Sequence, residues 1–209
     1  MLHCHGDALF GVVYNCCFLI IITDGKIGRG SSRNAITFTT QPSSQTLDDL
    51  LDIQQYLVKL FRDGTLTANS NSYFPIHFGP GISITQQGGE SCFAFCAYHG
   101  VVNVGTLSKL VLISYGVIPD VGSCPFNCHN HSNLFDDLTV ASSRALLGAI
   151  TNPVTLFSSN FMAWYDDPDG MEIGDLCDQK SGVVKDSNRN SWTVQSGWSN
   201  SRKKCYVPS

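Results

Sequence analysis

Two segments decide the fold, SSRALLGAITNP at 142–153 and AWYDDPDGMEIGDLC at 163–177. The first has apolar residues at helical spacing and stops at Pro153, which has no N–H to donate to the preceding helical turn. It therefore predicts a helix near 138–152. The second segment combines Pro, Asp and Gly residues, which is typical of turns.

Both segments resemble a family of secreted fungal and bacterial zincin-like proteins, which carry a segment of the form SSHELIEAITDP, followed by AWYD, a short turn and GEIGDIC. The resemblance covers roughly residues 27–209 and implies a zincin-like α+β fold with a mixed sheet. Counted back from Pro153, the family's His falls on Arg144, its first Glu on Ala145 and its second Glu on Gly148. A His and a Glu four residues apart share one helical face and can bind one Zn²⁺, whose water the adjacent Glu polarises.

This chain has lost that chemistry at all three positions. The guanidinium of Arg144 has no lone pair and repels a divalent cation, Ala145 cannot accept a proton, and Gly148 has no side chain. We therefore expect no metal or other cofactor on this helix, whereas the active relatives hold zinc. The resemblance then implies a catalytically inactive, metallopeptidase-like protein with a binding or scaffold role. Because glycine inside a helix costs about 0.5 to 1 kcal/mol, a larger residue at Gly148 is expected to increase stability.

Four residues outside the helix are candidates for the remains of the site. Glu172 and Asp175 match the family's EIGD segment, where the resemblance implies a third zinc ligand or a supporting carboxylate; Asp175 alternatively caps the following turn. His77 and His99 match the family in YFPIHF and CAYHG, although a single His among apolar neighbours is more often structural than a ligand. If either carboxylate faced the old metal position, Arg144 should now pair with it. The alternative is an Arg144 side chain that extends into solvent.

Two other functions remain open. An active metal-dependent hydrolase would need a relocated site, built from histidines and the carboxylates of the EIGD segment: His77, His99, His129 or His131 with Glu172 or Asp175. A compact metal site is also conceivable where two cysteines and two histidines lie within eight residues, at Cys124, Cys128, His129 and His131. A cell-wall-associated growth protein is the third candidate, because the plant phosphate-induced (exordium-like) family shows a distantly similar segment.

Composition narrows the expected partners. The chain has 209 residues, of which 14% are charged, and its formal net charge is −4. Basic residues are scattered except at 202–204, so nucleic acid is not an expected partner. A protein or a cell-wall polysaccharide is the expected partner class.

Nine cysteines in a chain of low charge indicate an oxidising compartment. The family has cysteines at the matching places, so the resemblance implies disulfides and an extracellular location. We expect a bridge between Cys177 and Cys205. Two more bridges are expected, with open pairing, among Cys92, Cys96, Cys124 and Cys128, while the amino-terminal cysteines, Cys4, Cys16 and Cys17, are expected to be unpaired or mispaired.

The amino-terminal segment 1–26 does not match the family, and we treat it separately from a single zincin-like domain at 27–209. Its apolar run at 8–22 is shorter than the about 20 residues that a transmembrane helix needs. A signal peptide is a poor fit, because the leader MLHCHGD contains no Lys or Arg and no cleavage site follows. A buried strand is the alternative.

A second helix, amphipathic, is predicted near 46–62 with a packing role. Thr46 is the expected N-cap, Asp49 occupies the capping-box position, and Gly64 follows the helix. The expected buried face comprises Leu47, Leu50, Leu51, Leu57, Val58 and Phe61.

Overall fold

The structure is a computed structural model, and it describes residues 12–14, 30–31, 35–37, 45–69, 71–106, 108–125, 128, 131–153 and 171–207. These residues form a mixed α and β fold, which confirms the α+β class. The strands are β1 (Val12–Tyr14), β2 (Ala35–Thr37), β3 (Thr46–Asp48), β4 (Tyr73–His77), β5 (Ser83–Gln86), β6 (Gly89–Glu90), β7 (Tyr98–Asn103), β8 (Leu112–Ile118), β9 (Ser181–Lys185), β10 (Ser191–Gln195), β11 (Gly197–Ser199) and β12 (Lys204–Tyr206). The helical elements are η1 (Asp49–Ile53), α1 (Gln54–Arg62), η2 (Val121–Ser123), α2 (Leu134–Thr151) and η3 (Asp175–Cys177).

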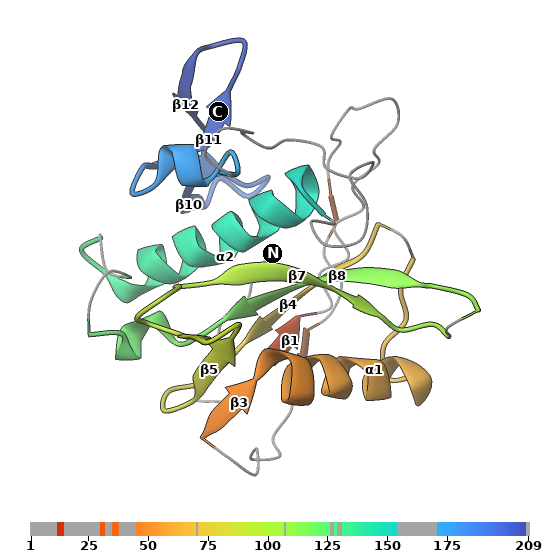
Figure 1. The fold of residues 1–209 in the computed structure, drawn as a ribbon. Helices are drawn as coiled ribbons and strands as arrows, with labels where there is room; N and C mark the ends of the chain where they lie inside the picture. Colours follow the sequence, from red (N-terminus) through yellow and green to blue (C-terminus); the bar gives the residue numbers. More distant parts are fainter. Residues whose placement is uncertain are drawn as a thin grey trace.

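A five-stranded mixed sheet forms the centre, in the order β2-β1-β4-β8-β7. Strands β4 and β8 are parallel, and the other neighbours are antiparallel. Strand β1 comes from the amino-terminal segment that the sequence set apart, and it pairs with both β2 and β4. Helix α2 covers one face of the sheet and α1 lies against the other (Figure 1).

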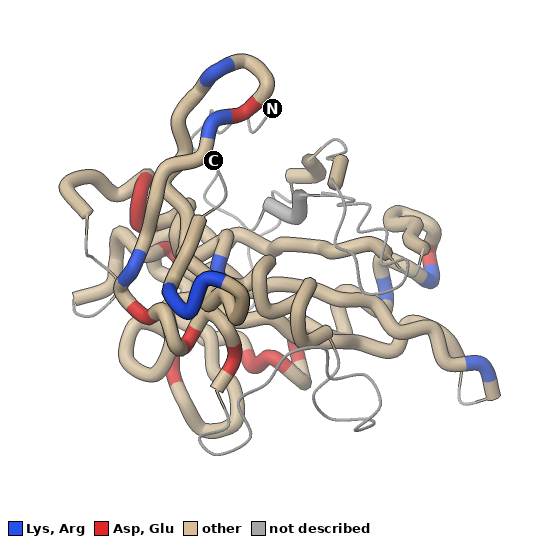
Figure 2. Tube along the Cα trace, turned by 90° about the horizontal axis from the view of Figure 1, so that it is seen from above, with Lys and Arg blue, Asp and Glu red and all other residues tan. Residues whose placement is uncertain are grey.

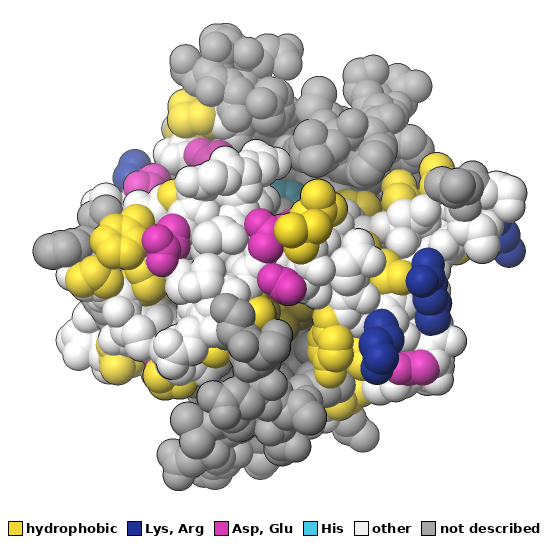
Figure 3. Space-filling view, turned by 60° about the horizontal axis from the view of Figure 1, so that its bottom comes forward, with side chains coloured by type: hydrophobic (Ala, Val, Ile, Leu, Met, Phe, Trp, Pro, Cys, Tyr) yellow, Lys and Arg dark blue, Asp and Glu magenta, His cyan; other side chains and the backbone are white. Residues whose placement is uncertain are grey.

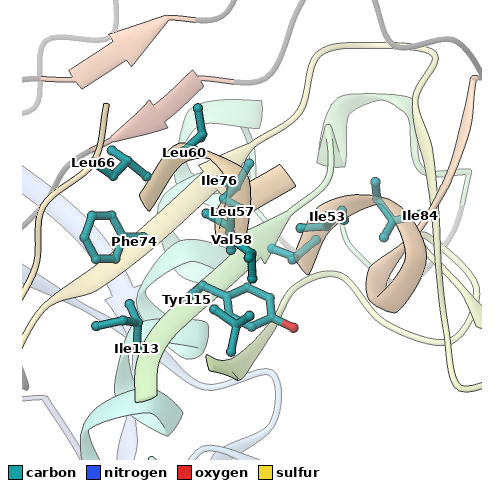
Figure 4. Close-up of a cluster of buried hydrophobic side chains, with 12 residues drawn as sticks. Ile53, Leu57, Val58, Leu60, Leu66, Phe74, Ile76, Ile84, Ile113 and Tyr115 are labelled. Atoms are coloured by element: carbon teal, nitrogen blue, oxygen red, sulfur yellow. The ribbon is translucent and has the colours of Figure 1, made fainter. Parts of the chain in front are cut away.

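The core on the α1 side is built from aliphatic and aromatic side chains of α1, β4 and β8. Phe74, Tyr115 and Leu57 are each at most 1% exposed, and they converge between the helix and the sheet (Figure 4). Phe61 packs edge-on against Phe74, with ring centroids 5.1 Å apart. The alternation of residues along β4 and β8 directs these side chains to one face of the sheet and leaves the other face to α2.

A buried carboxylate fixes the amino end of the helical segment η1–α1. Asp49 is 6% exposed and accepts hydrogen bonds from the hydroxyls of Tyr98 (2.7 Å) and Tyr115 (2.9 Å) and from Gln54 Nε2 (2.8 Å). Burial, together with this carboxylate, raises the pKa of both tyrosines. The tyrosines belong to β7 and β8, so these bonds join the helix to the sheet.

The predicted helix at 46–62 is partly wrong. Residues 46–48 are extended and pair in parallel with β5, so the N-cap is Asp48, whose Oδ1 accepts the N–H groups of Leu50 and Leu51. The helical segment therefore begins at Asp49 instead of Thr46, and its residues face other directions than predicted. As a result Leu50 and Leu51, which were expected to be buried, are 59% and 71% exposed.

Hydrophobic side chains on the α1 side of the surface form small, separate groups (Figure 3).

Helix α2 begins four residues before the predicted start at 138. The side chain of Asn133 accepts the N–H of Asp136 and caps the helix, so Asp136 and Asp137 lie in its first turn. The helix ends at Thr151, as Pro153 predicts. Its acidic first turn complements the positive end of the helix dipole.

The carboxyl-terminal region packs on the outer side of α2 as two hairpins, β9–β10 and β11–β12. Helix α2 contacts β10, and it is thereby enclosed between the central sheet and this hairpin (Figure 1). Lys and Arg residues are distributed over several elements, without a continuous basic stripe along the described trace (Figure 2). Within the described ranges, the helices are too short or too polar to cross a bilayer.

Within the described part of the chain, three disulfides join these elements. The expected Cys177–Cys205 bridge is present, with a Cα–Cα distance of 5.6 Å, and it ties η3 to β12. The pairing that the sequence left open is Cys92–Cys124 and Cys96–Cys128. These two bridges connect the segment before β7 to the loop before α2, and they indicate an oxidising environment.

We expect that removing the carboxyl-terminal bridge will destabilise the protein. The double variant Cys177→Ser, Cys205→Ser frees a loop of 28 residues in sequence separation, which increases the entropy of the unfolded chain. Urea unfolding should show a loss of about 2 to 4 kcal/mol relative to the wild type. An unchanged unfolding free energy would contradict a structural role for this bridge.

Candidate functional site

The guanidinium of Arg144 lies between two carboxylates. Its Nη2 donates to Asp175 Oδ1 at 2.5 Å and its Nη1 donates to Asp178 Oδ1 at 2.7 Å. Of the two carboxylates considered, Asp175 pairs with Arg144, whereas Glu172 accepts from Asn152 Nδ2. Arg144 joins the middle of α2 to the η3 turn.

Asp175 makes two contacts, and neither is the predicted cap of the following turn, since the N-cap of η3 is Gly174 and receives no side-chain hydrogen bond. Asp175 Oδ1 accepts from Arg144, and its Oδ2 accepts the backbone N–H of Glu172 at 2.9 Å. The carboxylate thus closes the turn that precedes η3 and also anchors the helix. The Arg144 and Asp175 side chains are 33% and 36% exposed, so water partly screens this pair.

A second cluster, made of His99, Asn152 and Glu172, lies at the carboxyl end of α2. His99 Nε2 is 3.0 Å from the backbone oxygen of Asn152, and the side-chain Nδ2 of Asn152 donates to Glu172 Oε1 at 2.8 Å. His99 Nε2 and Glu172 Oε1 are 3.7 Å apart. Asn152 is fully buried, and its side-chain Oδ1 has no hydrogen-bond partner among the described residues.

Gly148 is adjacent to this second cluster, and the space around it opposes the expected benefit of a larger residue there. A Cβ at Gly148 would lie 2.5 Å from His99 Nδ1 and 2.8 Å from Glu172 Oε2. Because Gly148 has no side chain, the His99 imidazole and the Glu172 carboxylate can approach the helix closely. Ala145, the third changed position, is buried at 2% exposure.

Arg144, Ala145 and Gly148 offer no side-chain ligand to a zinc ion. A carbonyl oxygen only accepts hydrogen bonds, so His99 Nε2 donates to Asn152, and the remaining lone pair of the ring is on Nδ1, beside Gly148. Arg144 supplies a fixed cation beside Asp175. Among the described residues, no group of three or more His, Cys, Asp or Glu side chains is arranged to hold a metal ion.

His77 and His99 share the sheet face that α2 covers. In the sheet register His77 is opposite Ile118 and His99 is opposite Gly116, so β8 lies between the two histidines. Burial lowers the pKa of His77 to about 4. His77 is thus a neutral, structural side chain at neutral pH.

The structure also assembles a group of which the sequence singled out only His131, and that only as a candidate metal ligand. His131 Nδ1 is 2.9 Å from Asp137 Oδ1, and His131 Nε2 is 2.9 Å from Ser181 Oγ. These residues line a pocket of about 70 Å³ together with Arg144 and Asp178. Ser181 lies 50 residues from His131 in sequence, so no local motif connects them.

Several expectations lie outside the described residues. They concern Cys4, Cys16 and Cys17, the AWYD part of the second segment at 163–166, and His129. The compact metal site next to His129 is not supported by its described members, because Cys124 and Cys128 are in disulfides and His131 contacts Asp137.

Comparisons with protein-family models, with curated proteins and with solved structures find no match to this chain. The relationship to zincin-like proteins therefore stays a prediction from the two segments quoted above.

Substitution of Gly148 tests the close contact at the end of α2. We expect Gly148→Ala to lower the free energy of unfolding by roughly 1 to 3 kcal/mol, because the new methyl group overpacks His99 and Glu172. Gly174→Ala is the matched control, since its Cβ would meet nothing nearer than 3.7 Å. Denaturant unfolding of both variants measures the difference. A higher free energy of unfolding for Gly148→Ala would contradict this expectation and show that helix propensity dominates at this position.

Acid should destabilise the protein through His77. Between pH 6.5 and about 4 the unfolded chain binds a proton at this histidine while the native state does not, so native stability falls as pH falls. The loss over this window is expected to be on the order of 1 to 3 kcal/mol. Unfolding measured across the window should show a smaller decline in His77→Gln. Parallel curves for the two proteins would contradict the assignment.

Proposed function

We propose that this protein is an extracellular, disulfide-bonded, metallopeptidase-like domain that has lost zinc-dependent catalysis and acts by binding a protein or a cell-wall polysaccharide. The observation that supports this proposal best is the pairing of Arg144 with Asp175 and Asp178. A permanent cation takes the helical position at which the resemblance places a zinc ligand.

Electrostatics favours the replacement of a zinc ion by the guanidinium of Arg144. Carboxylates gathered around a divalent cation repel one another once the cation is gone, and a guanidinium between two of them restores the balance. Arg144 uses two nitrogens to do this, which a lysine ammonium cannot reproduce with the same geometry. The network then stabilises the link between α2 and η3.

The location is supported by the three disulfides, since such bonds persist mainly in oxidising compartments. The low overall charge and the dispersed basic residues also favour a partner that is not a polyanion.

Metal content and peptidase activity test the loss of zinc chemistry. The purified chain should bind less than one zinc ion per molecule at micromolar free zinc, measured by calorimetry, and should hydrolyse casein no faster than buffer. Both results are expected because water activation needs the metal and a base together. One tightly held zinc with chelator-sensitive peptide hydrolysis would overturn the proposal.

The replacement role of Arg144 has its own test. Arg144→Ala leaves Asp175 and Asp178 without their cation and should lower the free energy of unfolding by about 1 kcal/mol, because the pair is partly exposed. Arg144→Lys is the matched control for charge and should recover only part of the loss. Equal stability of all three proteins would show that the pairing is not structural.

The partner class is tested by co-sedimentation of the intact chain with insoluble cell-wall polysaccharide, with bovine serum albumin as the control protein. Retention of the chain above the control supports the polysaccharide class, and its absence leaves the protein class.

A further inference from the structure

A serine, a histidine and a buried aspartate stand in a hydrogen-bonded row beside α2. The row runs from Ser181 Oγ to His131 Nε2 at 2.9 Å and from His131 Nδ1 to Asp137 Oδ1 at 2.9 Å. The Asp137 side chain is 2% exposed, the His131 side chain 20%, and Ser181 is exposed. We propose that these three residues form a nucleophilic site that hydrolyses short-chain carboxylic esters. This activity goes beyond the binding role proposed above and does not depend on it.

The hydrogen bonds assign the roles. A carboxylate oxygen only accepts, so Asp137 holds the proton on His131 Nδ1 and leaves the lone pair on Nε2. That lone pair faces the hydroxyl of Ser181, which is the arrangement a general base needs. Asp137 Oδ1 also accepts the backbone N–H of His131 at 3.1 Å, so one oxygen fixes both the main chain and the ring.

The row is held by rigid elements. Asp137 lies in the first turn of α2, and Ser181 begins β9, where it is opposite Gln195 of β10. The hairpin is attached to α2 by side-chain hydrogen bonds: the Thr139 hydroxyl donates to the Thr193 carbonyl at 2.7 Å, and Ser143 Oγ accepts the N–H of Gln195 at 2.8 Å. The Cys96–Cys128 bridge anchors the chain three residues before His131. Relative movement of nucleophile and base is thereby restricted.

The pocket at this row suits a small substrate group. Its volume of about 70 Å³ accommodates a group of a few non-hydrogen atoms, such as an acetyl group. Arg144 and Gln179 also line it. The side-chain amide of Gln179, and the N–H groups of Arg144 that are not used for Asp175 and Asp178, are the donors suited to an oxyanion that forms on a bound carbonyl. A short acyl ester of an alcohol that remains outside the pocket is the substrate class that fits.

The chemistry balances with water as the second substrate. Ser181 Oγ attacks the ester carbonyl carbon while its proton moves to His131 Nε2, and the carbonyl oxygen becomes an oxyanion. The tetrahedral intermediate expels the alcohol oxygen, which takes the proton from Nε2, and an acyl-serine remains. Water then gives a proton to Nε2 and attacks the acyl carbon, and collapse releases the carboxylic acid and restores the Ser181 hydroxyl. Asp137 is the positioning residue and stays ionised.

The same hydrogen bonds would also exist if His131 served only to fasten the loop to α2 and β9. The two roles differ in the reactivity of Ser181. A serine that faces a histidine lone pair reacts with diisopropyl fluorophosphate, losing its proton as the reagent loses fluoride, whereas an ordinary exposed serine does not.

The test uses the intact chain with EDTA present, so that a metal-dependent route is excluded. Mass spectrometry should find the phosphoryl adduct on Ser181, and p-nitrophenyl acetate should be hydrolysed with a kcat/KM at least about 100-fold above that of Ser181→Ala. Ser187→Ala, in the exposed turn after β9, is the matched control and should behave as the wild type. Asp137→Asn should lower kcat with little change in KM, because it mispositions the imidazole.

Absence of the adduct from Ser181, or equal ester hydrolysis by wild type and Ser181→Ala, would overturn the proposal. Ser181 is exposed, so its replacement is not expected to disturb folding, and thermal unfolding of each variant checks this point. Zinc binding, if it were found, would contradict the function proposed above and leave this result unaffected.

Discussion

The burial of β8 on both faces is the constraint on which the rest of the structure depends. Five of its seven residues are buried, and Tyr115, Val117 and Ile118 are at most 1% exposed. A strand enclosed in this way must be covered by a helix on each side, and the parallel pairing with β4 requires a long connection between the two strands. Helices α1 and α2 are the two covers.

The polar side chains of the candidate sites lie on helix α2 or contact it. Its first turn holds Asp137, its middle holds Arg144, and its carboxyl end meets His99 and Glu172. The hairpin β9–β10 packs on its outer side, so these groups face protein on two sides. Electrostatic interactions in such a layer are less screened than on an open surface.

Arg144 belongs to both polar regions of the helix. It closes the carboxylate network with Asp175 and Asp178, and it also lines the pocket in which His131 and Ser181 meet. The proposed loss of a zinc site and the proposed nucleophilic site on the same helix are thus physically compatible. The first needed ligands four residues apart on the helix, and the second takes its residues from three separate elements.

The sequence by itself determined what local chemistry controls. Pro153 ended α2, the cysteine count indicated disulfides, and the residue types at Arg144, Ala145 and Gly148 argued against a zinc site. Charge balance also favoured a pair between Arg144 and either Glu172 or Asp175, and the structure decided for Asp175 over Glu172 and over an Arg144 side chain in solvent. Each of these inferences used neighbours in sequence or one pair of complementary charges.

Only the tertiary structure decided features that depend on distant contacts. Helical propensity favoured a helix from Thr46, but residues 46–48 pair with β5, and strand pairing is a long-range interaction that overrides weak local preference. Helix propensity at Gly148 is likewise opposed by the tertiary structure, since His99 and Glu172 occupy the space around it. The pairing of Cys92 with Cys124, and the approach of Ser181 to His131, also required the folded chain. Side chains 32 and 50 residues apart meet only when the sheet, α2 and the hairpin are in place, and their spacing in the sequence does not indicate that they are in contact.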